Sequence, residues 1–224
     1  MFSSFASKLE DMKLERDFYL RDDTTQIARD LLGKLLVVPD ENGNRISGMI
    51  VETEAYLGIT DRAAHSYGGR RTARNEITYA VGGHVYVFFI YGMYYQLNVV
   101  CGEVDSPHVV LIRAVEPVEG IELMRKRRGF LSEPGAIASR SHRDTNLTSG
   151  PGKLCIALNI DRSLNGADLS GEHIWLEEYE KIEDDDIAVG KRIGIDYAGE
   201  DAEKPWRFWI AGNKFVSKSP NRVR

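Results

Sequence analysis

The sequence predicts one α+β domain, residues 1–224, built on a curved, mainly antiparallel β-sheet with surrounding helices and a protruding β-hairpin. Three observations support this prediction. Short apolar segments alternate with turn sequences, helical spacing is confined to a few short segments, and no repeat or low-complexity segment is visible. With 42% hydrophobic and 28% charged residues, a chain of this length can bury a substantial core.

The first expected elements are a short helix and a hairpin. Ile27, Leu31 and Leu32 recur at helical spacing after a threonine cap, and Gly33 is the expected stop. A strand is expected at 35–38, a turn in "DENGNR", and the partner strand in "ISGMIVETEAYLG". The next segment, "ITDRAAHSYGGRRTARNE", has no sustained period, which predicts a long functional loop with one helical turn.

A second hairpin is expected in "VYVFFIYGMYYQLNVV", residues 85–100, around a Gly-Met turn. Tyr91 lies at the rim of this turn, where small polar residues are usual, so a large aromatic there needs a functional reason. The later elements follow in order: a buried strand in "HVVLIRAVEP", a helix through "VEGIELMRKRR", an irregular "GFLSEPGAIASRSHRDTNLTSGPG", a short helix in "KLCIALNI", and short strands in "HIWLEEYE", "KRIGID" and "RFWIAG".

Several classes of protein are disfavoured by the sequence. The start, "MFSSFASKLEDMKLERD", carries acids and no apolar core, so it resembles neither a secretory signal nor a transit peptide. The longest apolar run is interrupted by Gly92, Gln96 and Asn98 well before it could span a bilayer. Cys101 and Cys155 have apolar neighbours and no CxxC or Cys/His pattern, which predicts buried thiols and no metal site. We therefore expect an intracellular protein that does not enter the membrane.

The net charge of −5 by itself argues against a nucleic-acid partner. The distribution of the charges along the chain weakens this argument. Acids are concentrated in residues 177–186. Basic residues gather in three other places: Arg70, Arg71 and Arg74; residues 125–128; and residues 204–224, which contain no acid. Each group alone is typical of a solvated surface, but together they favour an electropositive face.

Polar residues in apolar strands indicate a site. Alternation along a strand is expected to place Ile50, Glu52, Glu54 and Tyr56 on one face. Arg113 lies in the middle of an apolar strand, where an inward Glu is its natural partner. Asn98 must also find hydrogen-bond partners inside its strand.

This combination suits a nucleobase. Flat aromatic side chains fit the faces of a base, and a few polar groups fit its edges. His65 either contacts a base edge or only fixes its loop; the sequence leaves both open. At the hairpin tip, Tyr91 has the size to fill the gap left when a nucleotide leaves the stack.

The segments "VETEAYLG", "AAHSYGGRRTARN", "VYVFFIYGMYYQLNVV", "VLIRAVEPVEG" and "SGPGKLCIAL" resemble, in this order, the alkyladenine (3-methyladenine) DNA glycosylase family, over roughly residues 17–218. The resemblance implies a monofunctional base-excision repair enzyme without metal or organic cofactor. Such an enzyme hydrolyses the N-glycosidic bond of alkylated purines, and in many members deaminated adenine, in double-stranded DNA. A single domain that binds a DNA groove is expected to act as a monomer.

The resemblance also implies roles for individual residues. Glu54 of "ETEAY" is the expected general base that activates water, and Arg113 of "LIRAVEP" helps to hold that water. Tyr56 stacks on the flipped base, and His65 of "AAHS" hydrogen-bonds near it. Tyr91 of "YGMY" is the residue inserted into the duplex.

The remaining expected roles concern the pocket and the DNA backbone. Asn98 lines the pocket and helps to reject normal guanine. Phe88 stands where the family pattern has a second pocket tyrosine, so stacking is kept and a hydroxyl is lost, which leaves the preference among damaged bases open. The candidates for phosphate contacts are Arg70, Arg71, Arg74 and Lys153.

Two alternatives remain at this point. A bifunctional glycosylase-lyase would use a lysine such as Lys153 as its Schiff-base nucleophile. A non-catalytic module would only recognise distorted DNA, but such a protein has no use for a buried Glu54 and Arg113 pair directed at the pocket.

Overall fold

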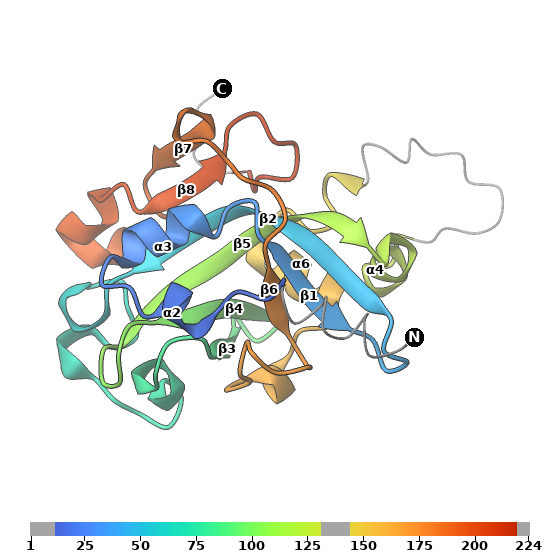
Figure 1. Cartoon of the computed structure of the whole chain (residues 1–224). Coiled ribbons are helices and arrows are strands. Elements are labelled where there is room, and N and C mark those ends of the chain that lie inside the picture. Colours follow the sequence, from blue (N-terminus) through green and yellow to red (C-terminus); the bar gives the residue numbers. More distant parts are fainter. Residues whose placement is uncertain (1–11, 131–143, 219–224) are drawn as a thin grey trace.

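The computed structural model describes residues 12–130 and 144–218, and its centre is one curved eight-stranded sheet (Figure 1). The strands are β1 (Leu35–Pro39), β2 (Arg45–Tyr56), β3 (Val85–Ile90), β4 (Tyr94–Cys101), β5 (His108–Glu119), β6 (Trp175–Glu177), β7 (Ile187–Gly190) and β8 (Arg207–Ile210). Their order is β3-β4-β5-β2-β1-β6, while β8 pairs with β2 and with β7. Neighbouring strands in the described ranges are antiparallel throughout, which confirms the predicted fold class.

Short helices surround this sheet. They are α2 (Arg16–Tyr19), α3 (Thr24–Asp30), α4 (Ile121–Arg127) and α6 (Pro151–Leu158). The predicted long loop contains three short 3₁₀ turns rather than one helical turn: Gly58–Thr60, Tyr67–Gly69 and Glu76–Tyr79. Within the described part of the chain, no helix is both long and apolar enough to cross a membrane.

The N-terminus of α3 corrects one detail of the sequence interpretation. Its cap is Asp23, not a threonine, because the Asp23 carboxylate accepts hydrogen bonds from the backbone N–H groups of Thr25 and Gln26. The predicted stop is correct. Gly33 has a φ of +82°, and a Cβ there would lie 2.2 Å from the carbonyl oxygen of Glu180.

The two faces of the sheet differ in chemistry because side chains alternate along each strand. The helix-covered face carries alternate residues that join the main core: Val85, Val87, Leu97, Val99, Val110 and Ile112. Residues of α3, α4 and α6 complete this core. The intervening residues, including Tyr86, Asn98 and Leu111, line a pocket on the opposite face, which the loops around residues 63–66 and 193–197 cover.

A β-bulge in β2 changes the predicted face pattern. Ile50 pairs with Val115 and Glu52 pairs with Ala114, so Val51 is the extra residue. As a result Ile50 belongs to the main core, whereas Glu52 contacts Arg113 on the other face. The expectation that Ile50 shares a face with both glutamates is therefore wrong. The bulge lies where the outer partner of β2 changes from β1 to β8.

The other elements largely agree with the predictions. The predicted strand in "KRIGID" is wrong, since β7 ends at Gly190 and a 3₁₀ segment begins at Asp196. Helix α6 begins at Pro151, two residues before the predicted start. Much of the predicted irregular segment, 131–143, lies outside the described residues. Both cysteines are buried and free, as expected.

Candidate functional site

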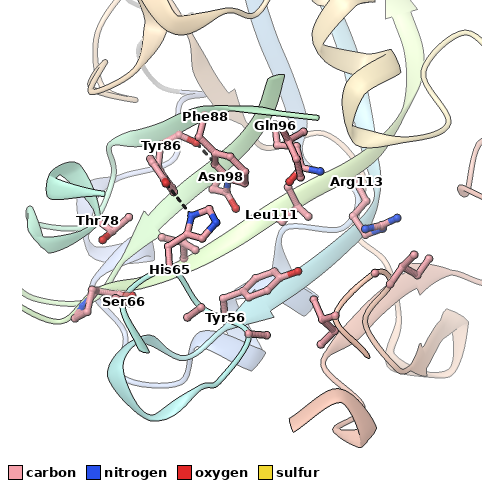
Figure 2. A pocket seen from close by; sticks show the side chains of 18 of the residues that line it. Tyr56, His65, Ser66, Thr78, Tyr86, Phe88, Gln96, Asn98, Leu111 and Arg113 are labelled. Atoms are coloured by element: carbon pink, nitrogen blue, oxygen red, sulfur yellow. Dashed lines mark hydrogen bonds between the residues drawn. The ribbon is translucent and has the colours of Figure 1, made fainter. Parts of the chain in front are cut away.

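The candidate site is a cavity of about 120 Å³ on the face of the sheet opposite the helices. Its walls come from β2, β3, β4 and β5 together with the segments around residues 63–66 and 193–197. Six of the residues predicted for the site line it: Tyr56, His65, Phe88, Tyr91, Asn98 and Arg113. Residues far apart in the sequence therefore meet in one pocket. Figure 2 labels all of the six except Tyr91.

Aromatic rings form two sides of this pocket. The ring of Phe88 lies 5.0 Å from that of Tyr86, at 30°, and 4.6 Å from the imidazole of His65, nearly edge-on. Tyr56 lies across the pocket from these three rings (Figure 2). A slot between facing aromatic rings suits a flat, polarizable ligand such as a purine.

His65 is neutral near pH 7. Burial lowers the pKa of its imidazole to about 4, and the nearby charges of Arg74 and Arg70 act in the same direction. Its Nδ1 is 2.8 Å from the hydroxyl of Tyr86, which fixes the ring within the pocket wall. A neutral imidazole leaves the pocket without a positive charge at this position, so a cationic base is not repelled there.

Glu54 is completely buried and lies directly behind the pocket wall. Its Oε1 accepts a hydrogen bond from the backbone N–H of Ile193 (2.8 Å) and lies 3.2 Å from Nη1 of Arg113. Its Oε2 accepts from the hydroxyl of Tyr56 (2.9 Å). The three donor residues line the cavity, whereas Glu54 itself does not. A carboxylate has about four acceptor positions, and Oε2 has one hydrogen-bond partner among the described residues whereas Oε1 has two.

Arg113 connects Glu54 to a second buried carboxylate. Its Nε donates to Oε1 of Glu52 at 2.9 Å, which confirms the expectation that an inward glutamate pairs with this arginine. Glu52 also accepts from Arg207 (3.2 Å) and from the backbone N–H of Ser217 (2.7 Å). The two carboxylates raise the pKa of Arg113 against the opposing effect of burial. Glu52 thus holds Arg113 in place from the side away from the pocket.

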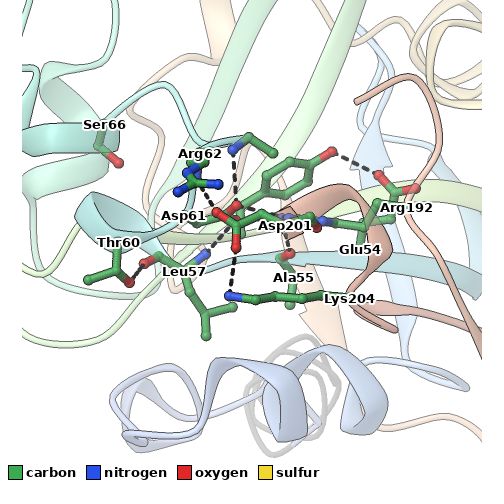
Figure 3. A network of polar contacts seen from close by, with 12 residues as sticks. Glu54, Ala55, Leu57, Thr60, Asp61, Arg62, Ser66, Arg192, Asp201 and Lys204 are labelled. Carbon is green, nitrogen blue, oxygen red and sulfur yellow. Dashed lines mark hydrogen bonds and ion pairs between the residues drawn. The ribbon is translucent and has the colours of Figure 1, made fainter. Parts of the chain in front are cut away.

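Arg192 is a residue that sequence reasoning missed. Its guanidinium is fully buried, pairs with Asp61, and donates to the backbone carbonyl of Ala55 at 2.9 Å (Figure 3). It also lies 4.6 Å from the ring of Tyr56 and 4.9 Å from that of Trp206. Arg192 therefore fixes both Tyr56 and the adjacent Ile193, two of the donors to Glu54. No local signal reveals this role, because its partner Asp61 is 131 residues away.

Asn98 and Gln96 contribute two amides from β4. The Nδ2 of Asn98 donates to the carbonyl of Tyr86 at 3.2 Å, which leaves its Oδ1 for a ligand. Gln96 was not predicted as a site residue, although it shares a strand face with Asn98.

Tyr91 stands at the tip of the β3-β4 hairpin with 76% of its surface exposed. The N–H of Met93 donates to the carbonyl of Ile90 at 3.2 Å, and both intervening residues have positive φ, +53° for Tyr91 and +67° for Gly92. Such turns favour Asn or Gly, so a tyrosine in this conformation costs roughly 1 kcal/mol or more. The hairpin therefore presents an aromatic ring at the pocket mouth despite a local energetic cost.

The predicted phosphate-contacting residues lie in different surroundings. Arg70 and Arg74 line a second hollow that shares His65 and Tyr197 with the pocket. Arg71 instead pairs with Glu76 and Asp105, which neutralise its charge locally.

Lys153 lies on α6, outside the residues that line the pocket, and its amine donates to the side chain of Asn146. Burial and the charges of Arg128 and Lys218 lower its pKa. In residues 12–130 and 144–218, no group of three or more His, Cys, Asp or Glu side chains is arranged to hold a metal ion.

Comparisons with known proteins identify the family of this chain. A family model described as methylpurine-DNA glycosylase matches residues 17–214. A protein of Clostridium acetobutylicum named "Putative 3-methyladenine DNA glycosylase" is 52% identical over 206 residues, which cover 92% of this chain and 98% of the relative. Proteins of the same name from Desulfitobacterium hafniense and Bacillus cytotoxicus are 51% and 46% identical, each over 92% of this chain and over 98% and 100% of their own lengths.

Proposed function

The chain belongs to the methylpurine-DNA glycosylase family and is a DNA glycosylase, a hydrolase of alkylated purines; on this premise we propose its substrate form and its mechanism. The proposed substrate is double-stranded DNA in which an alkylated or deaminated purine swings out of the stack and into the pocket. The protein acts as a monomer and releases the free base, as the first step of base-excision repair. The proposed steps use water and protein side chains.

The observation that carries the proposal is the buried Glu54 behind an aromatic slot, with Arg113 beside it. Aromatic faces attract the positive charge of an alkylated purine, and that charge also makes the base a good leaving group. As the bond between the base and C1′ lengthens, positive charge develops on the sugar. Glu54 is placed to stabilise this charge and to accept a proton from water bound at Oε2.

The other pocket residues have supporting roles in this proposal. Tyr56 stacks on one face of the flipped base, and Phe88 with His65 covers the other. Asn98, held by its bond to the carbonyl of Tyr86, helps to reject guanine because its side chain occupies the space that the 2-amino group of guanine would need. Tyr91 enters the duplex and occupies the space of the extruded nucleotide.

Arg70, Arg74 and Lys153 are the proposed phosphate contacts, and Arg71 is expected to contribute less because it is paired with Glu76 and Asp105. The hollow lined by Arg70 and Arg74 lies next to the pocket mouth, which supports their part of this proposal. The position of Lys153 outside the pocket lining argues against a lyase reaction through a Schiff base, since that amine must reach C1′.

The test is an excision assay with Glu54→Gln beside the wild type. Duplexes that contain hypoxanthine or 1,N6-ethenoadenine, and randomly methylated DNA, are incubated with each protein, and the released bases are quantified. General base catalysis is worth roughly 10²–10⁴ in rate, so we expect the variant to lose at least ~10²-fold while it still binds damaged duplex. Strong residual excision by the variant contradicts the assignment of Glu54. Borohydride trapping of a covalent adduct would favour the lyase alternative.

A further inference from the structure

Gln96 is a pocket residue to which the mechanism above gives no role. Its carboxamide lines the cavity, yet it forms no hydrogen bond with any residue of the described ranges. Two neighbouring side chains of the wall are partly engaged, since the Nδ2 of Asn98 donates to the carbonyl of Tyr86 and the Nδ1 of His65 bonds to the Tyr86 hydroxyl. An amide that keeps its donors and its acceptor free on a pocket wall has the properties of a ligand-binding group.

We propose that the Gln96 carboxamide donates a hydrogen bond to the N3 edge of the bound purine and so favours lesions whose N3 is unsubstituted. This inference rests on the proposed function and adds to it a residue that sets substrate preference.

The strand register locates Gln96 within the site. Gln96 pairs with Phe88 on β3, and Asn98 pairs with Tyr86 on β3 and with Leu111 on β5. Continuing the β4-β5 register by two residues places Gln96 opposite Arg113. Figure 2 shows this order across the pocket, from Phe88 through Gln96 to Arg113. Gln96 therefore lies between a stacking ring and the arginine that holds Glu54.

This position fixes which part of the purine Gln96 faces. The bond to be cleaved must lie at the end of the pocket where Arg113 and Glu54 meet, because Glu54 acts on water that attacks C1′. In the proposed function Asn98 faces the edge on which guanine carries its 2-amino group. Gln96 projects from the same face of β4, two residues nearer to the reacting end. On this edge of a purine, N3 lies between C2, which carries the 2-amino group in guanine, and C4, which is bonded to the glycosidic nitrogen N9. Gln96 therefore faces N3.

The chemistry of N3 then gives the direction of the preference. An unsubstituted N3, as in 7-methylguanine or hypoxanthine, has a lone pair that accepts a hydrogen bond from Nε2 of Gln96. A methyl group on N3, as in 3-methyladenine, removes that acceptor. Loss of the amide should therefore impair excision of bases with a free N3 and leave 3-methyladenine excision less affected. One neutral hydrogen bond corresponds to a change of about two- to tenfold.

The experiment uses methylated duplex DNA, from which one reaction can release both 3-methyladenine and 7-methylguanine. We compare the wild-type protein with Gln96→Leu and Gln96→Glu, neither of which offers the amide donor, and measure the ratio of the two initial rates. This ratio does not depend on the fraction of folded protein, and the intrinsic difference between the two bases cancels between variants. Gln26→Leu is the matched control, because it makes the same change on the exposed surface of α3.

We expect both Gln96 variants to shift the ratio toward 3-methyladenine by about two- to tenfold, and Gln26→Leu to leave it unchanged. An unchanged ratio in the Gln96 variants, or a shift toward 7-methylguanine, overturns this inference while the proposed function stands. A wild-type protein that releases neither base overturns the proposed function, and this inference falls with it.

Discussion

At the scale of single residues, the reacting end of the pocket combines burial with a full set of hydrogen-bond donors around Glu54. A buried carboxylate is costly unless it is paired, and here Tyr56, Arg113 and Ile193 provide the partners. The same contacts fix the carboxylate in one orientation, as a general base requires. Glu52 and Arg192 support these partners of Glu54: Glu52 holds Arg113, and Arg192 holds Tyr56.

The neutral state of His65 leads to a prediction about pH. With a pKa of about 4, His65 stays unprotonated from pH 8 down to about 5 and cannot repel a cationic base in this range. The ratio of 7-methylguanine excision to hypoxanthine excision should therefore follow the same pH profile in the wild type and in His65→Gln between about pH 8 and pH 5.5, because His65 contributes no charge there.

NMR titration of the imidazole provides the direct measurement. We expect a midpoint well below 6, and a midpoint near 6.5 would contradict the prediction. The lowered pKa of His65 also makes the free energy of unfolding depend on pH. Between about pH 4 and pH 6.5 the unfolded chain binds more protons at this histidine than the folded chain does, so its effect is to lower stability as the pH falls through that window.

At the scale of elements, the strands and helices with clear periodicity were predictable, and their long-range contacts were not. The β3-β4 hairpin follows from alternating aromatic and aliphatic residues, and α6 from its apolar spacing. The bulge at Val51 leaves no trace in the local pattern, since it depends on the register with β5. "KRIGID" resembles a strand, but the ion pair of Arg192 with Asp61 holds this segment as a loop over the pocket.

Some residues of the candidate site were likewise predictable from the sequence, and others were not. Glu54, Arg113 and Asn98 were identifiable because charged or amide groups within apolar strands need partners. Arg192 and Gln96 were not, because Arg192 lies in a loop and Gln96 lies near the hairpin turn, where a polar residue in a strand is common.

The hairpin tip gives a prediction for Tyr91. Its side chain is largely exposed, so Tyr91→Ala should change the melting temperature little. In duplex DNA, however, extrusion of a paired base costs a few kcal/mol, part of which an inserted ring offsets. We expect excision of hypoxanthine from a normal pair to fall about tenfold or more.

The control for Tyr91→Ala is the same lesion in single-stranded DNA, where no stack has to be refilled and the loss should be much smaller. Equal losses on the two substrates would show that Tyr91 serves the pocket itself rather than the duplex. Met93→Ala changes the neighbouring exposed residue and provides the matched variant.

At the scale of the whole molecule, the distribution of charge explains how a protein with a net charge of −5 can bind DNA. Several acids of residues 177–186 pair with basic residues away from the pocket: Glu177 with Arg45, Glu178 with Lys34, and Asp184 with Arg29 of α3. The hollow beside the pocket has three arginines and no acid among its lining residues. Negative charge and the proposed DNA surface are thus separated in space.

This separation makes Arg70 and Arg71 a matched pair for the final prediction. The two residues are adjacent in sequence, but Arg70 lines the hollow and forms no ion pair within the described ranges, whereas Arg71 already pairs with Glu76 and Asp105. Each phosphate contact contributes about 0.9 to the slope of log K against log salt concentration. We therefore expect Arg70→Gln to lower this slope by about 1 and to weaken binding. Arg71→Gln should change the slope much less.

Fluorescence anisotropy of a damaged duplex, titrated at several KCl concentrations, measures both slopes. The Glu54→Gln background prevents turnover during the titration, and binding of undamaged duplex reports the same electrostatic contribution without the pocket. If both variants lower the slope by the same amount, the ion pairs of Arg71 open when DNA binds, because only a released guanidinium can replace a counterion; a slope that Arg70→Gln leaves unchanged contradicts the prediction. A lower slope for Arg70→Gln alone would place the phosphate backbone over the hollow beside the pocket mouth.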